Sequence, residues 1–333
     1  MRTEASLDVL PPDDQGTIST IRMAIRAIHA ERRAMRPVMK FVLRCLAHPL
    51  PTIALLRAFR TLPPGFPPRA TQVDALLKIG REHMRIGLTA RQRADALALH
   101  YQVLARRLPP SLLAAYGSRT AICLAHLTGR DALYGFQIRL YQAPFGYRRE
   151  GEATLSLVSC ADGVRLADLT FTICAGRDGR PYSRIGGVQG PPQPDGKELI
   201  KAATKSLDGL RPKSLIIEAL YSLGRALGAE TILATSLSRH VLLRKKADLI
   251  RVNAYDAFWQ AMGGILLDSG DYLLPPKPLH RTPADVPARE RRAWERRQAH
   301  LASLTAQIRE TLIPGEAPPR PEPISADHPR AAA

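Results

Sequence analysis

The chain has 333 residues, 45% of them hydrophobic, so it can bury a sizeable core, and wholesale disorder is excluded. Its 48 Lys and Arg residues against 30 Asp and Glu residues give a formal net charge of +18. This charge favours an anionic partner such as nucleic acid, anionic lipid, coenzyme A or an acidic carrier protein, while only 5% aromatic residues argue against base stacking.

Residues 1–115 are predicted to form a helical region. Isoleucines recur at helical spacing from Ile18 to Ile28, and Pro37 suits the first turn of a helix that ends near Leu46. Further on, Thr89 stands three residues before Gln92, a capping-box pattern. The helix that follows carries an apolar face made of Ala94, Leu97, Tyr101, Leu104 and Leu108. We expect this face to dock on the rest of the protein.

Residues 116–275 are predicted to form the α/β core. Strand-like runs alternate with turn signals at Asp162-Gly163 and Asp178-Gly179, which predicts an antiparallel meander. Helical patterns return after the meander, and they are followed by a buried strand, a short helix and a hairpin. The strand runs lie at 121–127, 133–141, 152–159, 164–174 and 182–189; the later elements lie at 198–207, 212–227, 231–235, 256–262 and 265–274. The fold class expected is therefore α+β, with a mixed, mostly antiparallel sheet and flanking helices after an N-terminal helical region.

Residues 276–333 begin with a proline-rich connector. Arg289 to Glu310 fit one amphipathic helix that carries many arginines, and the composition beyond Pro314 is typical of a disordered tail. No stretch of the chain reaches the ~18 apolar residues of a membrane span, and the first residues lack a secretory signal pattern. We expect a cytoplasmic protein that can also lie peripherally at the inner membrane. The four cysteines form no Cys-x-x-Cys pair, so no metal site is predicted.

Four segments of the chain carry a family resemblance. They are 88–93 with His100-Tyr101, 185–191, 203–213, and 232–241 together with 255–259. In this order and spacing the chain resembles the VirK/YbjX family of bacterial proteins over roughly residues 85–310. The resemblance implies a protein associated with virulence, display of outer-membrane proteins and resistance to antimicrobial peptides. The family usually has His where this chain has Asp208 and Asn where it has Leu237, so no role is carried over to these two side chains.

The order of elements in the core also resembles that of GNAT-type acyltransferases, in which the amides at a helix start hold the pyrophosphate of coenzyme A. Here Arg211 and Lys213 flank the proline that opens the helix at 212–227, and Lys205 lies shortly before it. These cations predict an anion site, although a solvated helix face fits the same pattern. Gln189 and Gly190, at the end of the fifth strand run, are candidates to contact an acyl donor or, alternatively, to form a turn.

His240 is the leading candidate for a general base, because it follows the last core strand and a neutral imidazole can remove a proton near neutral pH. A structural histidine fits the same position. Ser236 is a candidate nucleophile, but no Gly-x-Ser-x-Gly elbow surrounds it.

The leading functional hypothesis is an acyltransferase that moves an acyl group from coenzyme A, or from the phosphopantetheine of an acyl carrier protein, to an amine or a hydroxyl. The net charge favours an acidic carrier protein. One alternative is a non-enzymatic envelope adaptor that binds anionic lipid or a partner protein. The other is a nucleic-acid binder, for which the sequence shows no helix-turn-helix, zinc finger or aromatic-basic RNA motif.

Overall fold

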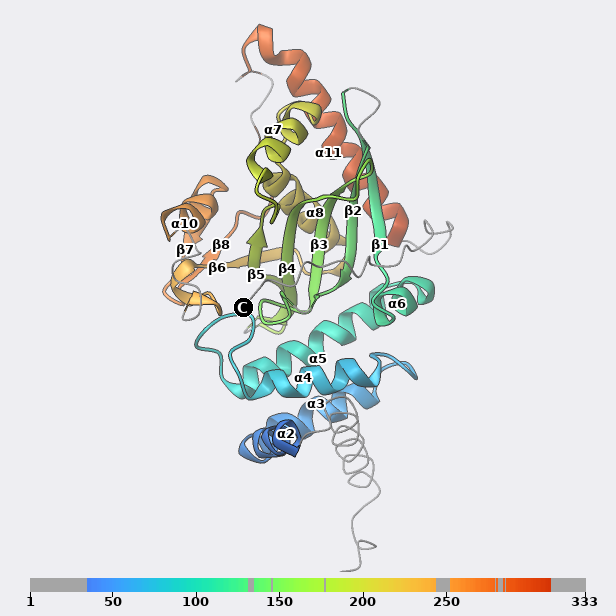
Figure 1. The fold of residues 1–333 in the computed structure, drawn as a ribbon, viewed down its shortest axis with the longest axis vertical. Coiled ribbons are helices and arrows are strands. Elements are labelled where there is room, and N and C mark those ends of the chain that lie inside the picture. The colour runs from blue at the N-terminus through green and yellow to red at the C-terminus, as the bar shows by residue number, and fades with distance from the viewer. Residues whose placement is uncertain are drawn as a thin grey trace, which may run out of the picture.

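The computed structural model describes residues 35–130, 135–144, 146–176, 178–243, 252–278, 280, 284 and 286–312. An eight-stranded sheet occupies the middle of the molecule, and the helices of the N-terminal region lie across one end of it (Figure 1). The predicted α+β class is confirmed. The helical pattern from Ile18 to Ile28 and the tail beyond Pro314 lie outside the described residues.

The sheet has the strand order β1-β2-β3-β4-β5-β6-β8-β7. The first five strands form the predicted antiparallel meander, β6 pairs parallel to β5, and β8 and β7 continue the sheet antiparallel. Their bounds are Ile122–Thr128 (β1), Gly135–Gln142 (β2), Ala153–Ser159 (β3), Arg165–Ala175 (β4), Pro181–Gln189 (β5), Thr231–Thr235 (β6), Ile265–Leu266 (β7) and Asp271–Leu273 (β8).

Helices after the meander pack on the sheet and on one another. α7 (Gly196–Ser206) and α8 (Pro212–Leu227) connect β5 to β6, and α8 packs on β3, β4 and β5. The final helix, α11 (Arg291–Leu312), lies along α8 and β1, while α10 (Val252–Ala261) packs beside the turn that follows β6. The parallel pairing of β5 with β6 thus results from a crossover through two helices.

The N-terminal helices contact the sheet mainly through α5 (Ala90–Arg107), which packs on β4. The predicted capping box at Thr89 and Gln92 starts α5, and its apolar face is buried, which confirms that this face docks on the core. The other helices of this region are α2 (Met35–Ala47), α3 (Pro49–Arg60), α4 (Arg69–Ile79) and α6 (Pro110–Gly117). Among the described residues, no helix combines the length and apolar character needed to cross a membrane.

The local turn predictions also hold. Gly163 and Gly179 adopt the positive φ angles of 71° and 77° that tight hairpin turns require of glycine. α10 starts four residues earlier than the sequence pattern indicated, and α11 runs two residues beyond Glu310. Helix ends are the least determined feature of a periodic pattern, because the last turn contributes few buried side chains.

Candidate functional site

The candidate site lies where β5 and β6 diverge. Their parallel pairing covers only Tyr182–Ile185 of β5 and Thr231–Ala234 of β6. β5 continues for four more residues, Gly186–Gln189, of which Gly187, Val188 and Gln189 remain paired with β4 on the other side. Within the described strands these four residues have no partner on the β6 side, and the two strands separate in Figure 1. An opening in the strand pairing therefore begins at Gly186, while Gly186, Gly187 and Val188 themselves are buried by other segments.

A β-bulge marks the start of this opening. Ile185 pairs with Phe171 and Gly187 pairs with Thr170, so Gly186 is the extra residue of the bulge. A Cβ atom on Gly186 would lie 1.7 Å from the carbonyl oxygen of Glu150, and one on Gly187 would lie 1.9 Å from the Glu150 side chain. The two glycines are needed because the loop between β2 and β3 presses Glu150 against β5.

Glu150 is a buried carboxylate that gathers two of the predicted site residues. Gln189 Nε2 donates to both of its carboxylate oxygens, at 3.3 and 3.2 Å. His240 Nε2 lies 3.9 Å from Glu150 Oε1. Gln189 and His240 are far apart in the sequence, and the glutamate between them brings them into one polar cluster.

The state of His240 follows from its contacts. Its Nδ1 accepts a hydrogen bond of 3.3 Å from the backbone N–H of Leu242, which favours the tautomer with a proton on Nε2, facing Glu150. Burial lowers the pKa of His240 to about 4, so the ring is neutral at pH 7. The Tyr255 ring stands edge-on to it at 5.5 Å between centroids. Burial raises the pKa of the Tyr255 phenol above its usual value, and the nearby backbone of Val188 lowers it by a smaller amount.

The N-terminal region closes one side of this cluster. The segment between α4 and α5 runs past both the Glu150 loop and the turn before His240. The backbone N–H of Met84 donates to the carbonyl of Arg149, at 2.8 Å, and that of Ile86 donates to the carbonyl of Arg239, at 2.7 Å. Residues 84–86 therefore hold the neighbours of Glu150 and His240 in place.

Ser236 follows β6 directly but is not joined to the Glu150 cluster by any contact among the described residues. Its side chain is buried, and its hydroxyl lies 3.0 Å from that of Ser238. Leu237, at the start of the short 3₁₀ turn that leads to His240, donates its backbone N–H to Asp256 at 2.8 Å. In this position Ser236 shapes the turn that carries His240.

Two of the cations predicted to bind an anion, Arg211 and Lys213, lie at the start of α8. Arg211 is the N-cap residue and Pro212 occupies the first turn, as predicted. A Cβ atom on Gly190 would lie 3.8 Å from Cε of Lys213, so the end of β5 and the start of α8 are in contact. Burial lowers the pKa of Lys213, and no ion-pair partner for its ammonium occurs among the described residues. Arg211 and Lys205, which lie close to Lys213 in the sequence, are both exposed.

Sequence reasoning missed Glu150 and Tyr255. Glu150 lies in the loop 143–152, where no period or motif marks it. Tyr255 lies on α10, in a family segment to which no site role was assigned. The pair Gly186-Gly187 was the available signal, because two glycines inside a strand indicate close approach of another chain segment.

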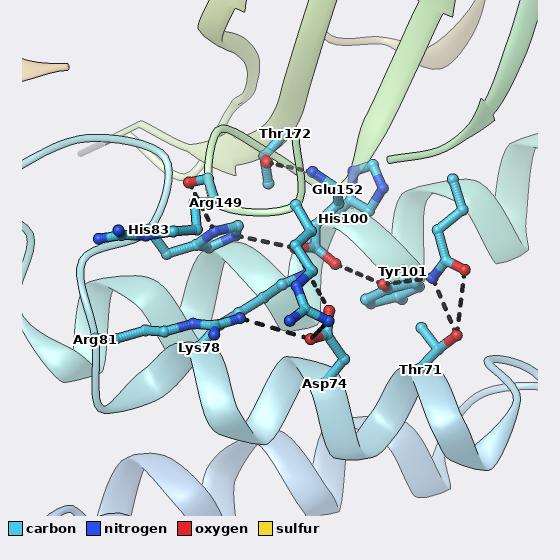
Figure 2. Close-up of polar contacts among 12 residues, drawn as sticks. Thr71, Asp74, Lys78, Arg81, His83, His100, Tyr101, Arg149, Glu152 and Thr172 are labelled. Atoms are coloured by element: carbon cyan, nitrogen blue, oxygen red, sulfur yellow. Dashed lines mark hydrogen bonds and ion pairs between the residues drawn. The ribbon is translucent and has the colours of Figure 1, made fainter. Parts of the chain in front are cut away.

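A second polar cluster lies at the junction of the N-terminal helices with the sheet (Figure 2). Glu152 is its centre: Lys78 Nζ lies 2.6 Å and His83 Nε2 lies 2.9 Å from Oε1, and the Tyr101 hydroxyl donates to Oε2 at 2.6 Å. His100, from the first family segment, contacts the Tyr116 hydroxyl at 3.1 Å. These side chains are buried, so this cluster serves to join the two regions.

Comparisons with known proteins agree with the sequence resemblance. The model of a family described as "Protein of unknown function (DUF535)" matches residues 30–310. The chain is 28% identical over 280 residues to the "Uncharacterized protein YbjX" of Escherichia coli K12, covering 83% of each chain. It is 33% identical over 125 residues to an "Uncharacterized protein" of Haemophilus influenzae, covering 38% of this chain and 42% of that protein. The predicted relationship to YbjX is confirmed.

Proposed function

The chain belongs to the DUF535 family, and on the geometry of its own site we propose that it transfers an acyl group from a carrier thioester to an amine or hydroxyl acceptor. The observation that carries the proposal is the divergence of β5 and β6 beside the start of α8. Diverging parallel strands offer unpaired backbone groups to an extended ligand, and a helix start offers amides to phosphate.

The donor fits this opening as an extended arm. A pantetheine chain has amide groups that can pair with Gly186–Gln189 on the side where β6 does not, as a further strand would. The phosphate at its other end would meet the start of α8, where Lys213 and Arg211 supply positive charge. The analogy to GNAT-type acyltransferases, whose sheet opens between parallel strands around coenzyme A, is one of fold and lends support without deciding the chemistry.

Glu150 and His240 are the groups that can handle the proton. When the acceptor nitrogen or oxygen forms its bond to the thioester carbon, its proton must leave, and the carbon–sulfur bond then breaks to give a thiol that needs a proton. His240 remains the predicted base. Because Leu242 engages the Nδ1 lone pair, Glu150 is a second candidate, with the Nε2–H of His240 stabilising its charge.

Donor binding tests the proposal. Affinities for coenzyme A, for an acyl-coenzyme A and for an acylated carrier protein are measured by calorimetry on the native chain. They are also measured on the double variant Arg211→Ala/Lys213→Ala. Loss of two charge-assisted contacts should weaken donor binding by about tenfold or more. The matched control is Arg57→Ala/Arg106→Ala, which removes two exposed cations from α3 and α5. Equal donor affinity in all three proteins would contradict the proposal.

One observation favours a second candidate function, an adaptor that contacts anionic lipid. Met39, Leu43, Leu46 and Leu50 repeat at helical spacing on α2 and the start of α3, with exposed fractions of 59–74%. Such a face on a protein of net charge +18 fits an interfacial helix. Co-sedimentation with vesicles of anionic and of neutral lipid tests it: Leu43→Glu/Leu46→Glu should abolish binding to the anionic vesicles. Equal binding by the native chain and the variant would contradict the adaptor function.

A further inference from the structure

A basic surface lies at the end of the molecule opposite the N-terminal helices, and we call it the basic cap. It consists of six exposed cations: Arg130, Lys201, Lys205, Arg211, Arg292 and Arg296. They come from the start of the β1–β2 connection, from α7, from the start of α8 and from the first half of α11. α7 and this half of α11 lie together at the top of Figure 1. Segments far apart in the sequence therefore build one positive surface.

Asp208 holds the cap together. Its buried carboxylate, in the turn between α7 and α8, accepts a hydrogen bond from Arg130 Nη2 and one from Arg296 Nε, both at 2.8 Å. His300 Nε2 lies 3.5 Å from the other oxygen. The backbone N–H of Arg130 also donates to the carbonyl of Ser206, at 2.8 Å. One carboxylate thus anchors α11 and the β1 end on the turn before α8, and it neutralises only one of the cations around it.

The cations of the cap form two rows. Lys201 and Lys205 are four residues apart on α7, and Arg292 and Arg296 are four residues apart on α11, so each pair shares a helix face. The exposed acids on α7 and on this half of α11 are Glu198 and Glu295, which leaves the surface positive. Two rows of cations at this end of the molecule complement a helix that carries acidic residues at the same spacing.

The cap also adjoins the opening described above. Asp208 lies three residues before Arg211, which caps α8, and Lys213 in the first turn of α8 contacts the end of β5. A partner seated on the cap would therefore stand next to the predicted phosphate position. A free nucleotide would engage one phosphate position, whereas the cap spreads its charge over several segments, which favours a macromolecular partner.

We infer that the basic cap is the docking surface for an acidic carrier protein, which delivers its acylated pantetheine arm to the opening between β5 and β6. This inference rests on the proposed function and selects the carrier-bound thioester as its donor. The rows on α7 and α11 steer and orient the carrier, and the arm passes the start of α8 to reach Gly186–Gln189.

Charge reversal on α7 tests this inference. Lys201→Glu/Lys205→Glu changes the cap by four charges without touching the contacts of Asp208. Arg57→Glu/Arg106→Glu makes the same change at the other end of the molecule and serves as the matched control. The dissociation constant of a phosphopantetheine-loaded acyl carrier protein is measured for the full chain and both variants, at about 50 and about 200 mM salt. Affinity for coenzyme A and the circular dichroism spectrum are recorded in parallel.

The α7 variant should lose about tenfold in carrier affinity at low salt and less at high salt. The control should lose less than about twofold. Because Lys205 also belongs to the predicted anion site, the single variant Lys201→Glu is measured as well, and its coenzyme A affinity should change little. Equal loss in both variants would overturn the inference. Binding of coenzyme A without binding of any carrier would overturn it and leave the proposed function intact, while binding of neither donor would reject both. Preference of the cap for duplex DNA over the carrier would also overturn it.

Discussion

Two glutamates that flank Gly151 lie in opposite kinds of surroundings. Glu152 faces the N-terminal helices and is held by Lys78, His83 and Tyr101. Glu150 faces the end of β5, where Gln189 donates to it and His240 stands 3.9 Å away. Both carboxylates are only 1% exposed. The first has a buried ammonium at hydrogen-bond distance, and the second meets an amide and an imidazole beside an opening in the sheet.

The different partners of the two glutamates indicate different roles, one in joining the N-terminal helices to the sheet and one in proton transfer. Burial opposes the ionisation of Glu152, but the ammonium of Lys78 and the His83 ring outweigh it and hold the pKa of Glu152 below its usual range. A carboxylate that stays ionised and fully paired fixes the N-terminal helices on the sheet. A buried carboxylate beside a neutral histidine and an unpaired strand edge keeps the capacity to exchange a proton. Variants of the two sites test this distinction.

The largest expected effect is on stability at the Glu152 cluster. Glu152→Gln removes the 2.6 Å partner of the buried Lys78 ammonium and leaves it only Asp74, at 2.8 Å. The cost should therefore lie near the lower end of the about 3–5 kcal/mol that removing one member of a buried ion pair typically carries. Chemical denaturation of the purified variant measures the free energy of unfolding. Asp95→Asn, which breaks the exposed pair with Arg91, is the control and should cost less than about 1 kcal/mol. If Glu152→Gln cost no more than the control, the cluster would not be what joins the two regions.

His240→Ala should act on turnover instead. General-base assistance is worth ~10²–10⁴ in rate, so acyl transfer should fall by about that factor while donor affinity stays nearly constant. His240→Asn keeps a hydrogen-bonding side chain but cannot carry the proton, and it should be as slow. Glu150→Gln distinguishes the two candidate bases, because it should slow acyl transfer to a similar extent only if Glu150 is the base. A drop in stability with unchanged turnover per folded molecule would instead make His240 a structural residue.

Gly187→Ala should disturb the opening without touching the Glu152 cluster. The new Cβ would meet Glu150 Oε2 at 1.9 Å, and this side chain must leave Gln189 to make room. Overpacking of this kind costs about 1–3 kcal/mol. Gly146→Ala in the same loop meets no atom within 4 Å and is the control. Turnover of Gly187→Ala should fall well below that of Gly146→Ala. Equal turnover would show that the position of Glu150 is unimportant.

The smallest expected effect is the response of stability to acid. Burial lowers the pKa of His100, in the cluster of Figure 2, and of His240, at the opening, each to about 4. An unfolded chain takes up these protons near pH 6.5, so stability is full above about pH 6.5 and is lost as the pH falls toward 4. Each ring contributes at most about 1.4 kcal/mol per pH unit.

Denaturation at pH 7, 6 and 5 (about one unit apart) measures this slope for the native chain and for His240→Asn. The variant should lose the contribution of one ring and keep that of His100. Burial also lowers the pKa of His83, so the cluster retains a steep response of its own. An unchanged slope in the variant would mean that the ring of His240 protonates as freely in the folded chain as in the unfolded one.

Much of the fold could be predicted because it is encoded locally. The alternation of residues in β3 and β4, the glycines at 163 and 179, and the capping box at Thr89 each depend on neighbours within a few positions. The start of α8 at Pro212 and the strand Thr231–Thr235 were predicted to the residue, since a proline and a short apolar run leave few alternatives. The parallel pairing of β5 with β6 comes from a crossover that the sequence implies only by element order.

The candidate site was only partly predictable. His240, Gln189 and Lys213 could be named from their places after strands and at a helix start, where pockets form in α/β proteins. Glu150, the common neighbour of His240 and Gln189, could not be named, because it lies in an aperiodic loop whose course depends on contacts with Met84 and β5.

Local patterns were enough to identify the helices, the strands, their turns and the strongly basic composition, because periodicity, glycine, proline and charge act over short range. That Glu150 lies beside His240 while Glu152 pairs with Lys78 depends instead on long-range packing. The two positions on either side of Gly151 point to different neighbours, and those neighbours come from segments far away in the sequence. Which buried carboxylate finds an ammonium and which one faces an opening depends on the packing of the whole chain.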